Sequence, residues 1–253
     1  MARVRAAVLA AGMSVRMGGV KPKTLMGVGD HKPFLHYILA GLQQAKIEDL
    51  LVVTGFKSSL VEDFVTDNWH GEAAFVFNAR YASWGNFHSA RMAIDQSPQS
   101  ELLLVNSDIV IHPDVFRGVI NKPGDLVLAV QQRTDFDIEE MRVRLETDRV
   151  VSIGKDLPLE QSHGEFVGVS LLRHEAARAY AATATDLEWR AETALYYEDV
   201  YSRLLRRLDA RALSVSEDHY AEVDNPSEID AAVEVITRHR ASWPEPVAAR
   251  TET

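Results

Sequence analysis

Short apolar runs alternate with helical patterns over the first half of the chain. Four runs of mostly aliphatic residues predict buried strands, at 6–11, 49–54, 73–77 and 102–105. Residues 33–46 carry apolar side chains at helical spacing, with Pro33 suited to a first turn, and shorter helical patterns include 60–64 and 92–94. Strands that alternate with helices indicate a parallel sheet built from right-handed βαβ units.

The pattern changes after residue 125. Three shorter and more alternating runs, with a turn at 147–148, predict an antiparallel hairpin region attached to the sheet, at 126–130, 141–146 and 150–153. Further elements are expected as a strand at 165–172, helices at 175–182 and 191–208, strands at 212–215 and 221–223, and a helix at 226–238 capped by Asn225. We therefore predict a Rossmann-like α/β fold: a mostly parallel sheet flanked by helices, with a small antiparallel hairpin or lid region in the second half.

The length of 253 residues suits one α/β domain. We expect this domain to span 1–240, with lid elements mainly in 125–210 and a flexible tail at 241–253. The absence of cysteine excludes disulfides, thiolate metal sites and cysteine nucleophiles. Because no long apolar segment is visible, we expect a cytoplasmic protein with no membrane partner and no secretory signal.

The formal net charge of −10 argues against a nucleic-acid partner, since phosphate backbones are bound by basic faces. Within this acidic background, residues 16–32 hold a local group of cations opposed only by Asp30, namely Arg16, Lys21, Lys23 and Lys32. Such a patch suits a small anionic ligand, although a solvated basic loop is the plain alternative.

The first apolar run ends at Gly12 in a glycine-rich loop. In open α/β sheets ligands bind at the carboxyl ends of the strands, and glycines let backbone N–H groups approach an anion. The dinucleotide fingerprint is absent, because its third and sixth positions counted from Gly12 are Ser14 and Met17. A Walker loop is absent as well, because five residues separate Gly12 from Gly18. The loop nevertheless indicates the handling of a polyphosphate.

The order that remains is Ala-Ala-Gly-x-x-x-Arg-Met-Gly followed by Pro-Lys-x-Leu, and it resembles the signature loop of the sugar-nucleotidyltransferase superfamily. Those enzymes join a nucleoside triphosphate to a phosphorylated small molecule and release pyrophosphate. The resemblance implies that Arg16 holds the leaving phosphates and that Lys23 stabilises charge at the α-phosphate. It also implies nucleotide contacts from the loop at Leu9, Ala10, Ala11, Gly12, Met13, Ser14, Val15 and Gly18.

Two aspartates are candidates for a metal site. Asp108 follows an apolar strand, where a carboxylate suits Mg²⁺, although a turn or cap aspartate is the alternative. The resemblance favours the metal, since Asn106-Ser107-Asp108 falls where the superfamily has its metal-binding pair, and it implies that Ser107 contacts the nucleotide. Asp224, in Asp-Asn-Pro-Ser-Glu, resembles the second metal aspartate, although a strand-to-helix turn would also account for it. We therefore expect Mg²⁺ as the cofactor.

The stretch Tyr81-Ala-Ser-Trp-Gly-Asn-Phe-His-Ser resembles the Tyr-x(3-4)-Asn-Asn-x-x-Ser stretch of cytidylyltransferases that act on phosphocholine and phosphonates. The resemblance implies base and ribose contacts from Asn86 and Ser89. Gly85 departs from the pattern by replacing the first asparagine. A loop followed by an ordinary helix start remains the alternative.

The second half of the chain resembles the phosphocholine and phosphonoalkyl cytidylyltransferase branch. The segments concerned are Glu139-Glu-Met-Arg-Val, Val-Ser-Ile-Gly-Lys155, Gly-Glu165-Phe-Val-Gly and Tyr196-Tyr-Glu-Asp-Val. The resemblance implies acceptor contacts from Glu165, Tyr197, Glu198 and Asp199. Carboxylates beside aromatic rings suit an amine or quaternary ammonium. A solvated helix face with tyrosines in the core is the alternative.

Our hypothesis from the sequence is a Mg²⁺-dependent cytidylyltransferase that joins CTP to a phosphorylated or phosphonate small molecule. One alternative is a sugar-1-phosphate or cyclitol-phosphate nucleotidyltransferase that uses UTP, dTTP or GTP. Another is a nucleotide-binding regulator without catalysis. The resemblance spans about residues 4–238 and leaves open the acceptor and a homodimer.

Overall fold

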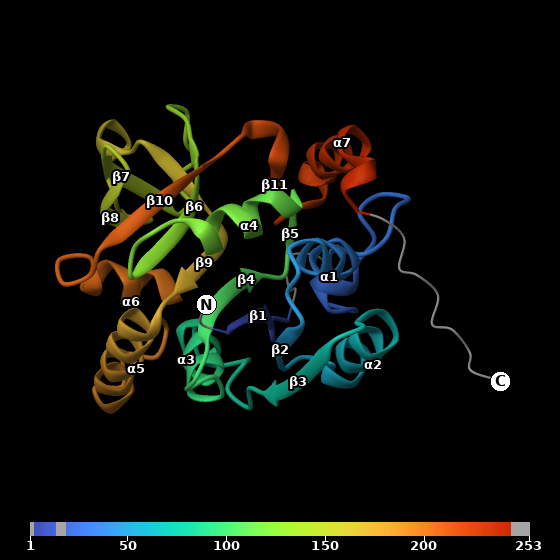
Figure 1. The fold of residues 1–253 in the computed structure, drawn as a ribbon, viewed down its shortest axis with the longest axis horizontal. Helices are drawn as coiled ribbons and strands as arrows, with labels where there is room; N and C mark the ends of the chain where they lie inside the picture. The colour runs from blue at the N-terminus through green and yellow to red at the C-terminus, as the bar shows by residue number, and fades with distance from the viewer. Residues whose placement is uncertain (1–2, 14–18, 244–253) are drawn as a thin grey trace.

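The computed structural model describes residues 3–13 and 19–243. A nine-stranded sheet forms the centre of this part of the chain (Figure 1). Its strands are, in spatial order, β3 (Glu72–Phe77), β2 (Asp49–Thr54), β1 (Val4–Ala10), β4 (Glu101–Asn106), β9 (Gly164–Leu172), β6 (Leu126–Gln132), β10 (Ala210–Val215), β8 (Arg149–Gly154) and β7 (Arg142–Glu146). A separate two-stranded ribbon pairs β5 (Ile109–Ile111) with β11 (Tyr220–Glu222).

The first half of the sheet is parallel. Strand β1 pairs in parallel with β2 on one side and with β4 on the other, and β2 pairs in parallel with β3. Strand β9 is antiparallel to its neighbours β4 and β6. The prediction of a Rossmann-like, mostly parallel sheet flanked by helices is therefore confirmed, and β1 and β4 end at the same edge.

The predicted hairpin exists as β7 and β8, and Thr147 in its turn has a positive φ of 60°. Strand β6 is not part of it, because β6 pairs in parallel with β10 and antiparallel with β9. Strand β8 pairs with β10, and β7 returns to pair with the start of β9. The strands of the second half therefore extend the large sheet, and its last strand, β7, pairs a second time with a central strand, β9.

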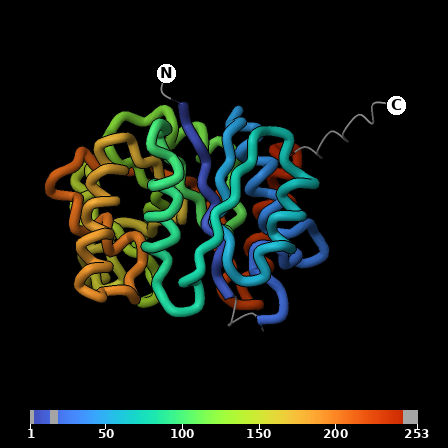
Figure 2. Tube along the Cα trace, turned by 90° about the horizontal axis from the view of Figure 1, so that it is seen from below, coloured from blue at the N-terminus to red at the C-terminus, as the bar shows by residue number. Residues whose placement is uncertain are grey.

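Helices cover both faces of the sheet. One apolar cluster holds side chains of α3 (Phe87–Asp95), α5 (His174–Trp189) and α6 (Tyr197–Leu204). A second cluster lies on the other face of the sheet. It holds side chains of α1 (Phe34–Gln44), α2 (Ser58–Asn68) and α4 (Pro113–Asn121). In Figure 2 the blue helices lie on one side of β1 and the yellow and orange segments on the other.

The last helix, α7 (Ile229–Arg238), packs beside α1 and the ribbon (Figure 1). This third cluster joins Phe34 and Tyr37 to Val235 and to Trp243, which is 6% exposed. Packing therefore continues past residue 240, where the sequence analysis placed the end of the domain. The remainder of the predicted tail, 244–253, lies outside the described residues.

Two stretches differ from the predictions. The helix expected at 191–208 is confined to α6, because the Thr193 and Leu195 carbonyls accept hydrogen bonds from the Gly85 and Phe87 amides. Strand β5 and helix α4 were not predicted, although His112 and Pro113 form a regular helix start.

Short 3-10 turns complete the described elements, at Lys23–Leu25, Leu159–Gln161, Glu217–His219, Pro226–Glu228 and Arg240–Ser242. The Asn225 cap is present and forms a capping box with Glu228. Within residues 3–13 and 19–243, none of the helices has the length and apolar character that a membrane crossing requires.

Candidate nucleotidyl-transfer site

A cleft of about 290 Å³ opens at the edge where β1 and β4 end. The end of β1 contributes Leu9 and Ala10, and the chain that follows contributes Ala11 and Gly12. The side chains of Ala10 and Ala11 are small, and a Cβ atom added at Gly12 would have no neighbouring atom within 4 Å. The cleft therefore lies where an open α/β sheet is expected to bind its ligand.

Lys23 joins the two predicted metal aspartates. Its Nζ lies 2.9 Å from Asp108 Oδ2 and 2.6 Å from Asp224 Oδ1. Burial acts to lower the pKa of Lys23, but the Asp108 and Asp224 carboxylates outweigh burial and raise it. The structure therefore brings together, on one cleft, the three side chains that the sequence singled out from distant positions.

A third carboxylate lies beside them. Glu222 sits on β11 opposite Ile109 of β5, and this pairing places it next to Asp108. Carboxylate oxygens of Asp108, Glu222 and Asp224 lie within 4.8 Å of one another. Burial, then the charges of Asp108 and Asp224, raise the pKa of Glu222 well above its usual range. Three acidic groups thus share a site that Lys23 compensates in part.

This donor set fits a hard divalent cation. Mg²⁺ prefers carboxylate oxygens combined with phosphate oxygens and water, and three such carboxyl groups converge here. The Lys23 ammonium already occupies a position between Asp108 and Asp224, so the site holds positive charge. The raised pKa of Glu222 indicates that more cationic charge would be accommodated favourably.

Seven of the predicted nucleotide contacts line this cleft, namely Leu9, Ala10, Ala11, Gly12, Asn86, Ser89 and Ser107. The Asn86 side-chain oxygen accepts from the Tyr197 amide, and the Ser89 hydroxyl accepts from the Asn78 side chain, each at 2.9 Å. Met13 is partly buried and does not line the cleft. The predicted contacts Ser14, Val15, Arg16 and Gly18 lie outside the described residues.

The resemblance implied that Tyr197 contacts the acceptor, and the structure places its side chain in the core. Its ring is fully buried, and its hydroxyl donates to Asn106 Oδ1 at 2.9 Å. Since its amide also bonds Asn86, one residue fixes two asparagines of the cleft. Asp199 likewise accepts from the Tyr196 amide within a capping box. Neither Tyr197 nor Asp199 lines either of the clefts described.

A larger cleft of about 1120 Å³ adjoins the first and shares Asn86, Asn106, Asp108 and Asp224 with it. Its walls come mainly from the second half of the chain. Among the described residues on these walls, acidic residues outnumber basic ones by twelve to three. The electrostatic potential of this cleft therefore favours a cationic group.

Glu165 and Glu198 both lie on this larger cleft and are both buried. Burial raises the pKa of Glu165 to about 7, although its ion pair with Arg133 at 2.7 Å opposes the rise. Burial also raises the pKa of Glu198 to about 8. Within the described residues, Glu198 Oε2 accepts no hydrogen bond. A buried carboxylate oxygen without a donor is unusual and is suited to a cationic ligand.

Several residues of these clefts were not predicted from the sequence. Glu222 was missed although it stands two positions before Asp224, because only strand alternation places it on the same side. Asn106 was part of the Asn106-Ser107-Asp108 motif but was not chosen. Arg133, which bridges Glu140 at 2.5 Å and Glu165, carried no sequence signal.

A profile of the MobA-like NTP transferase domain matches residues 6–223. The D-glycero-alpha-D-manno-heptose 1-phosphate guanylyltransferase of Aneurinibacillus thermoaerophilus is 25% identical over 140 residues, which are 53% of this chain and 60% of that protein. The chain thus matches less than two thirds of this relative's length.

Two solved structures are similar over nearly the whole chain, each with a TM-score of 0.77. The inositol-1-phosphate CTP transferase from T. maritima is 19% identical, and the match covers 92% of this chain and 96% of that one. The CTP:phosphocholine cytidylyltransferase from Streptococcus pneumoniae is 22% identical, with 93% and 99% covered. At these identities the likeness establishes the fold.

Proposed function

The chain belongs to the family of MobA-like NTP transferase domains, and on that premise we propose that it is a Mg²⁺-dependent cytidylyltransferase. Its substrates in this proposal are CTP and a small phosphate or phosphonate that also carries an ammonium group. The observation that carries the proposal is the bridge from Lys23 to Asp108 and Asp224 on a cleft at the carboxyl edge of the sheet.

The chemistry requires little covalent work from the protein. An acceptor phosphate or phosphonate oxygen attacks the α-phosphorus of the triphosphate, the bond from that phosphorus to the β-phosphate oxygen breaks, and pyrophosphate leaves. Mg²⁺, when bound, supplies positive charge for the phosphate oxygens. Asp108 and Asp224, with Glu222 beside them, would hold it. With Asp108 and Asp224 paired to Mg²⁺ instead of to Lys23, the Lys23 ammonium would stabilise the charge that develops at the α-phosphate.

The asparagines of the cleft support a nucleobase contact. Tyr197 engages the side-chain oxygens of Asn86 and Asn106. In the part of the chain that the structure describes, each Asn Nδ2 therefore remains as a donor, and a cytosine ring offers a carbonyl oxygen and a ring nitrogen as acceptors. Two proteins with the same fold are described as CTP-dependent, which is the reason for ranking CTP ahead of other triphosphates.

The larger cleft supports a zwitterionic acceptor. Its walls carry an excess of carboxylates, and Glu198 Oε2 lacks a donor within the described residues. An ammonium group beside Glu198 would supply that missing partner. The three cations that line the cleft within residues 3–13 and 19–243, namely Arg133, Lys155 and Arg238, are too few to favour an acceptor that carries only negative charge.

A pyrophosphate-release assay tests the proposal. CTP, UTP, GTP and dTTP are each combined with phosphocholine, 2-aminoethylphosphonate, inositol phosphate and sugar 1-phosphates, with Mg²⁺ present. We expect release with CTP and an ammonium-bearing acceptor, and none from the Asp108→Asn variant. Release with a sugar phosphate and another triphosphate would favour the sugar-1-phosphate alternative. Nucleotide binding without release under any pair would favour a regulator.

A further inference from the structure

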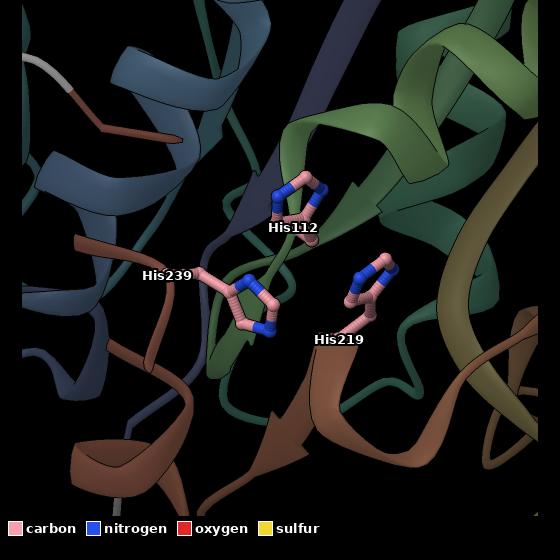
Figure 3. A group of neighbouring side chains, drawn as sticks. All are labelled: His112, His219 and His239. Atoms are coloured by element: carbon pink, nitrogen blue, oxygen red, sulfur yellow. The ribbon is translucent and has the colours of Figure 1, made fainter. Parts of the chain in front are cut away.

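Three histidines converge at one end of the β5–β11 ribbon, where β5 ends and β11 begins. His112 follows β5, His219 precedes β11, and His239 follows α7. One nitrogen from each imidazole lies within 4.8 Å of the others. Figure 3 shows the three side chains close together, each coming from a separate segment. The fold therefore gathers imidazoles from positions that are 20 to more than 100 residues apart in sequence.

The rings pack closely. His112 and His219 stack with their centroids 4.3 Å apart, and His239 stands edge-on to both at 4.9 Å. Protonated imidazoles would repel one another at these distances. Burial, followed by the charges of His219 and His239, lowers the pKa of His112. The neutral imidazole, which is the form that binds metal ions, is therefore favoured at His112.

Hydrogen bonds orient two of the rings. His239 Nε2 lies 3.2 Å from Asp218 Oδ2, which leaves Nδ1 as the nitrogen available to a metal. A carboxylate on the far nitrogen is the usual support of a metal-bound histidine. His112 Nδ1 caps α4 by accepting from the Asp114 amide, and Nε2 lies 2.8 Å from Ser242 Oγ. In the part of the chain that the structure describes, the His219 ring makes no hydrogen bond.

We propose that His112, His219 and His239 form a binding site for a divalent transition metal of the Zn²⁺ type, with Asp218 supporting His239. Imidazole nitrogens suit Zn²⁺, Ni²⁺ and Cu²⁺, whereas Mg²⁺ prefers oxygen ligands. At His112 the metal replaces the Ser242 hydroxyl as the partner of Nε2. The site is separate from the Asp108–Glu222–Asp224 carboxylates and does not depend on the proposed nucleotide chemistry.

The position of the cluster indicates what the metal does. Strands β5 and β11 pair through Tyr220 and Ile111 at the histidine end and through Glu222 and Ile109 at the carboxylate end. Two residues of extended chain, roughly 7 Å, separate these ends. A metal at the histidine end ties both strands to the end of α7. It therefore stabilises the ribbon that aligns the carboxylates without taking part in the reaction.

The test uses the untagged full chain, stripped with a chelator, in excess Mg²⁺ to saturate the carboxylates. Zn²⁺ binding is measured by calorimetry, and Co²⁺ binding by its visible absorption. We expect one equivalent to bind and to raise the melting temperature. His219→Ala and His239→Ala, shown to be folded by circular dichroism, should each weaken binding by roughly 10–100-fold or more and abolish the rise.

His31→Ala and His70→Ala are the matched controls, since both histidines are exposed and lie outside the cluster. They should bind Zn²⁺ as the unsubstituted chain does. The proposal is overturned if the unsubstituted chain binds neither metal in stoichiometric amount. It is equally overturned if the folded His219→Ala and His239→Ala variants bind Zn²⁺ with unchanged affinity.

Discussion

Lys23 Nζ lies 2.6 Å from Asp224 Oδ1, although 201 positions separate the two residues in the sequence. The same nitrogen bonds Asp108, so one ammonium group joins the loop after β1 to the ends of β4 and β11. The positive charge of Lys23 and the negative charges of the two aspartates therefore form one group.

Replacing Lys23 by alanine should slow pyrophosphate release by about 10²–10³-fold, the usual cost of losing one preorganised charge-stabilising group. The variant should remain folded, and Mg²⁺ should raise its melting temperature more than that of the unsubstituted chain, because its carboxylates lack the ammonium. Steady-state kinetics and thermal denaturation measure both effects. Lys32→Ala, at an exposed position, is the control. Near-normal turnover in Lys23→Ala would remove Lys23 from the mechanism.

Asp108→Asn and Asp224→Asn should each reduce turnover on the same scale, about 10²–10³-fold, because each removes a charged oxygen from the metal site. Both should also lose the rise in melting temperature that Mg²⁺ produces. Asp230→Asn, in the exposed first turn of α7, should retain it. An unchanged response to Mg²⁺ in both variants would place the metal elsewhere.

Glu222 should make Mg²⁺ binding depend on pH. Because its pKa is raised above the ordinary value of 4.5, Glu222 is protonated at pH values where an ordinary glutamate is ionised. Without metal, its contribution to stability is complete below about pH 4.5 and is lost as the pH rises through its raised pKa. Since Mg²⁺ binds the ionised form, metal affinity should rise as the pH rises toward this raised pKa.

Glu222→Gln should flatten this dependence, because glutamine does not titrate. Mg²⁺ titrations of both proteins at a series of pH values above the ordinary pKa of glutamate measure the slopes. Equal slopes in the two proteins would contradict a role for Glu222 in metal binding.

Glu198 should couple the binding of a cationic acceptor to proton release. With a pKa raised to about 8, the buried side chain is protonated at neutral pH, and an ammonium ligand favours its ionised form. Affinity for such an acceptor should therefore rise by up to about tenfold per pH unit below pH 8. Glu198→Gln should bind more weakly and without this slope.

The raised pKa of Glu198 also makes the stability of the folded protein depend on pH. The contribution of Glu198 is complete below its ordinary pKa of 4.5 and is lost as the pH rises to about 8. Glu198→Gln should therefore become more stable than the unsubstituted chain toward alkaline pH, by roughly 3–5 kcal/mol at 1.4 kcal/mol per unit. Urea unfolding at several pH values measures this difference in the free energy of unfolding. A constant difference between the two proteins would show that Glu198 does not titrate in this range.

Gly85→Asn restores the asparagine of the cytidylyltransferase pattern, yet it should destabilise the protein. A Cβ at this position would overlap the Leu195 carbonyl oxygen. Because that atom is backbone, the 193–195 segment would have to move, at a cost of about 1–3 kcal/mol or more. Denaturant unfolding measures the loss. Gly154→Ala, whose nearest contact would be 4.0 Å away, should cost less than about 1 kcal/mol. Equal stabilities of the two variants would contradict the steric argument.

Local sequence patterns determined much of the fold. The aliphatic runs that became β1, β2 and β4, and the glycine that follows β1, carry their own evidence of strand and turn, since period and propensity act over a few neighbouring residues. The motifs around Lys23, Asp108 and Asp224 also sufficed to select these three residues for one site. The helix expected at 191–208 failed because Gly85 and Phe87 use the carbonyls of that stretch, and such long-range hydrogen bonds leave no local pattern.

Only the tertiary structure decided the rest of the site. Glu222 joins Asp108 because β11 pairs with β5, two strands that are more than 100 residues apart in sequence. Tyr197, selected as an acceptor contact, instead anchors Asn106 because α6 packs its ring into the core. His112, His219 and His239 meet only when the ribbon and α7 are assembled. Distance, burial and pKa depend on neighbours in space, and a chain specifies those neighbours only through its complete fold.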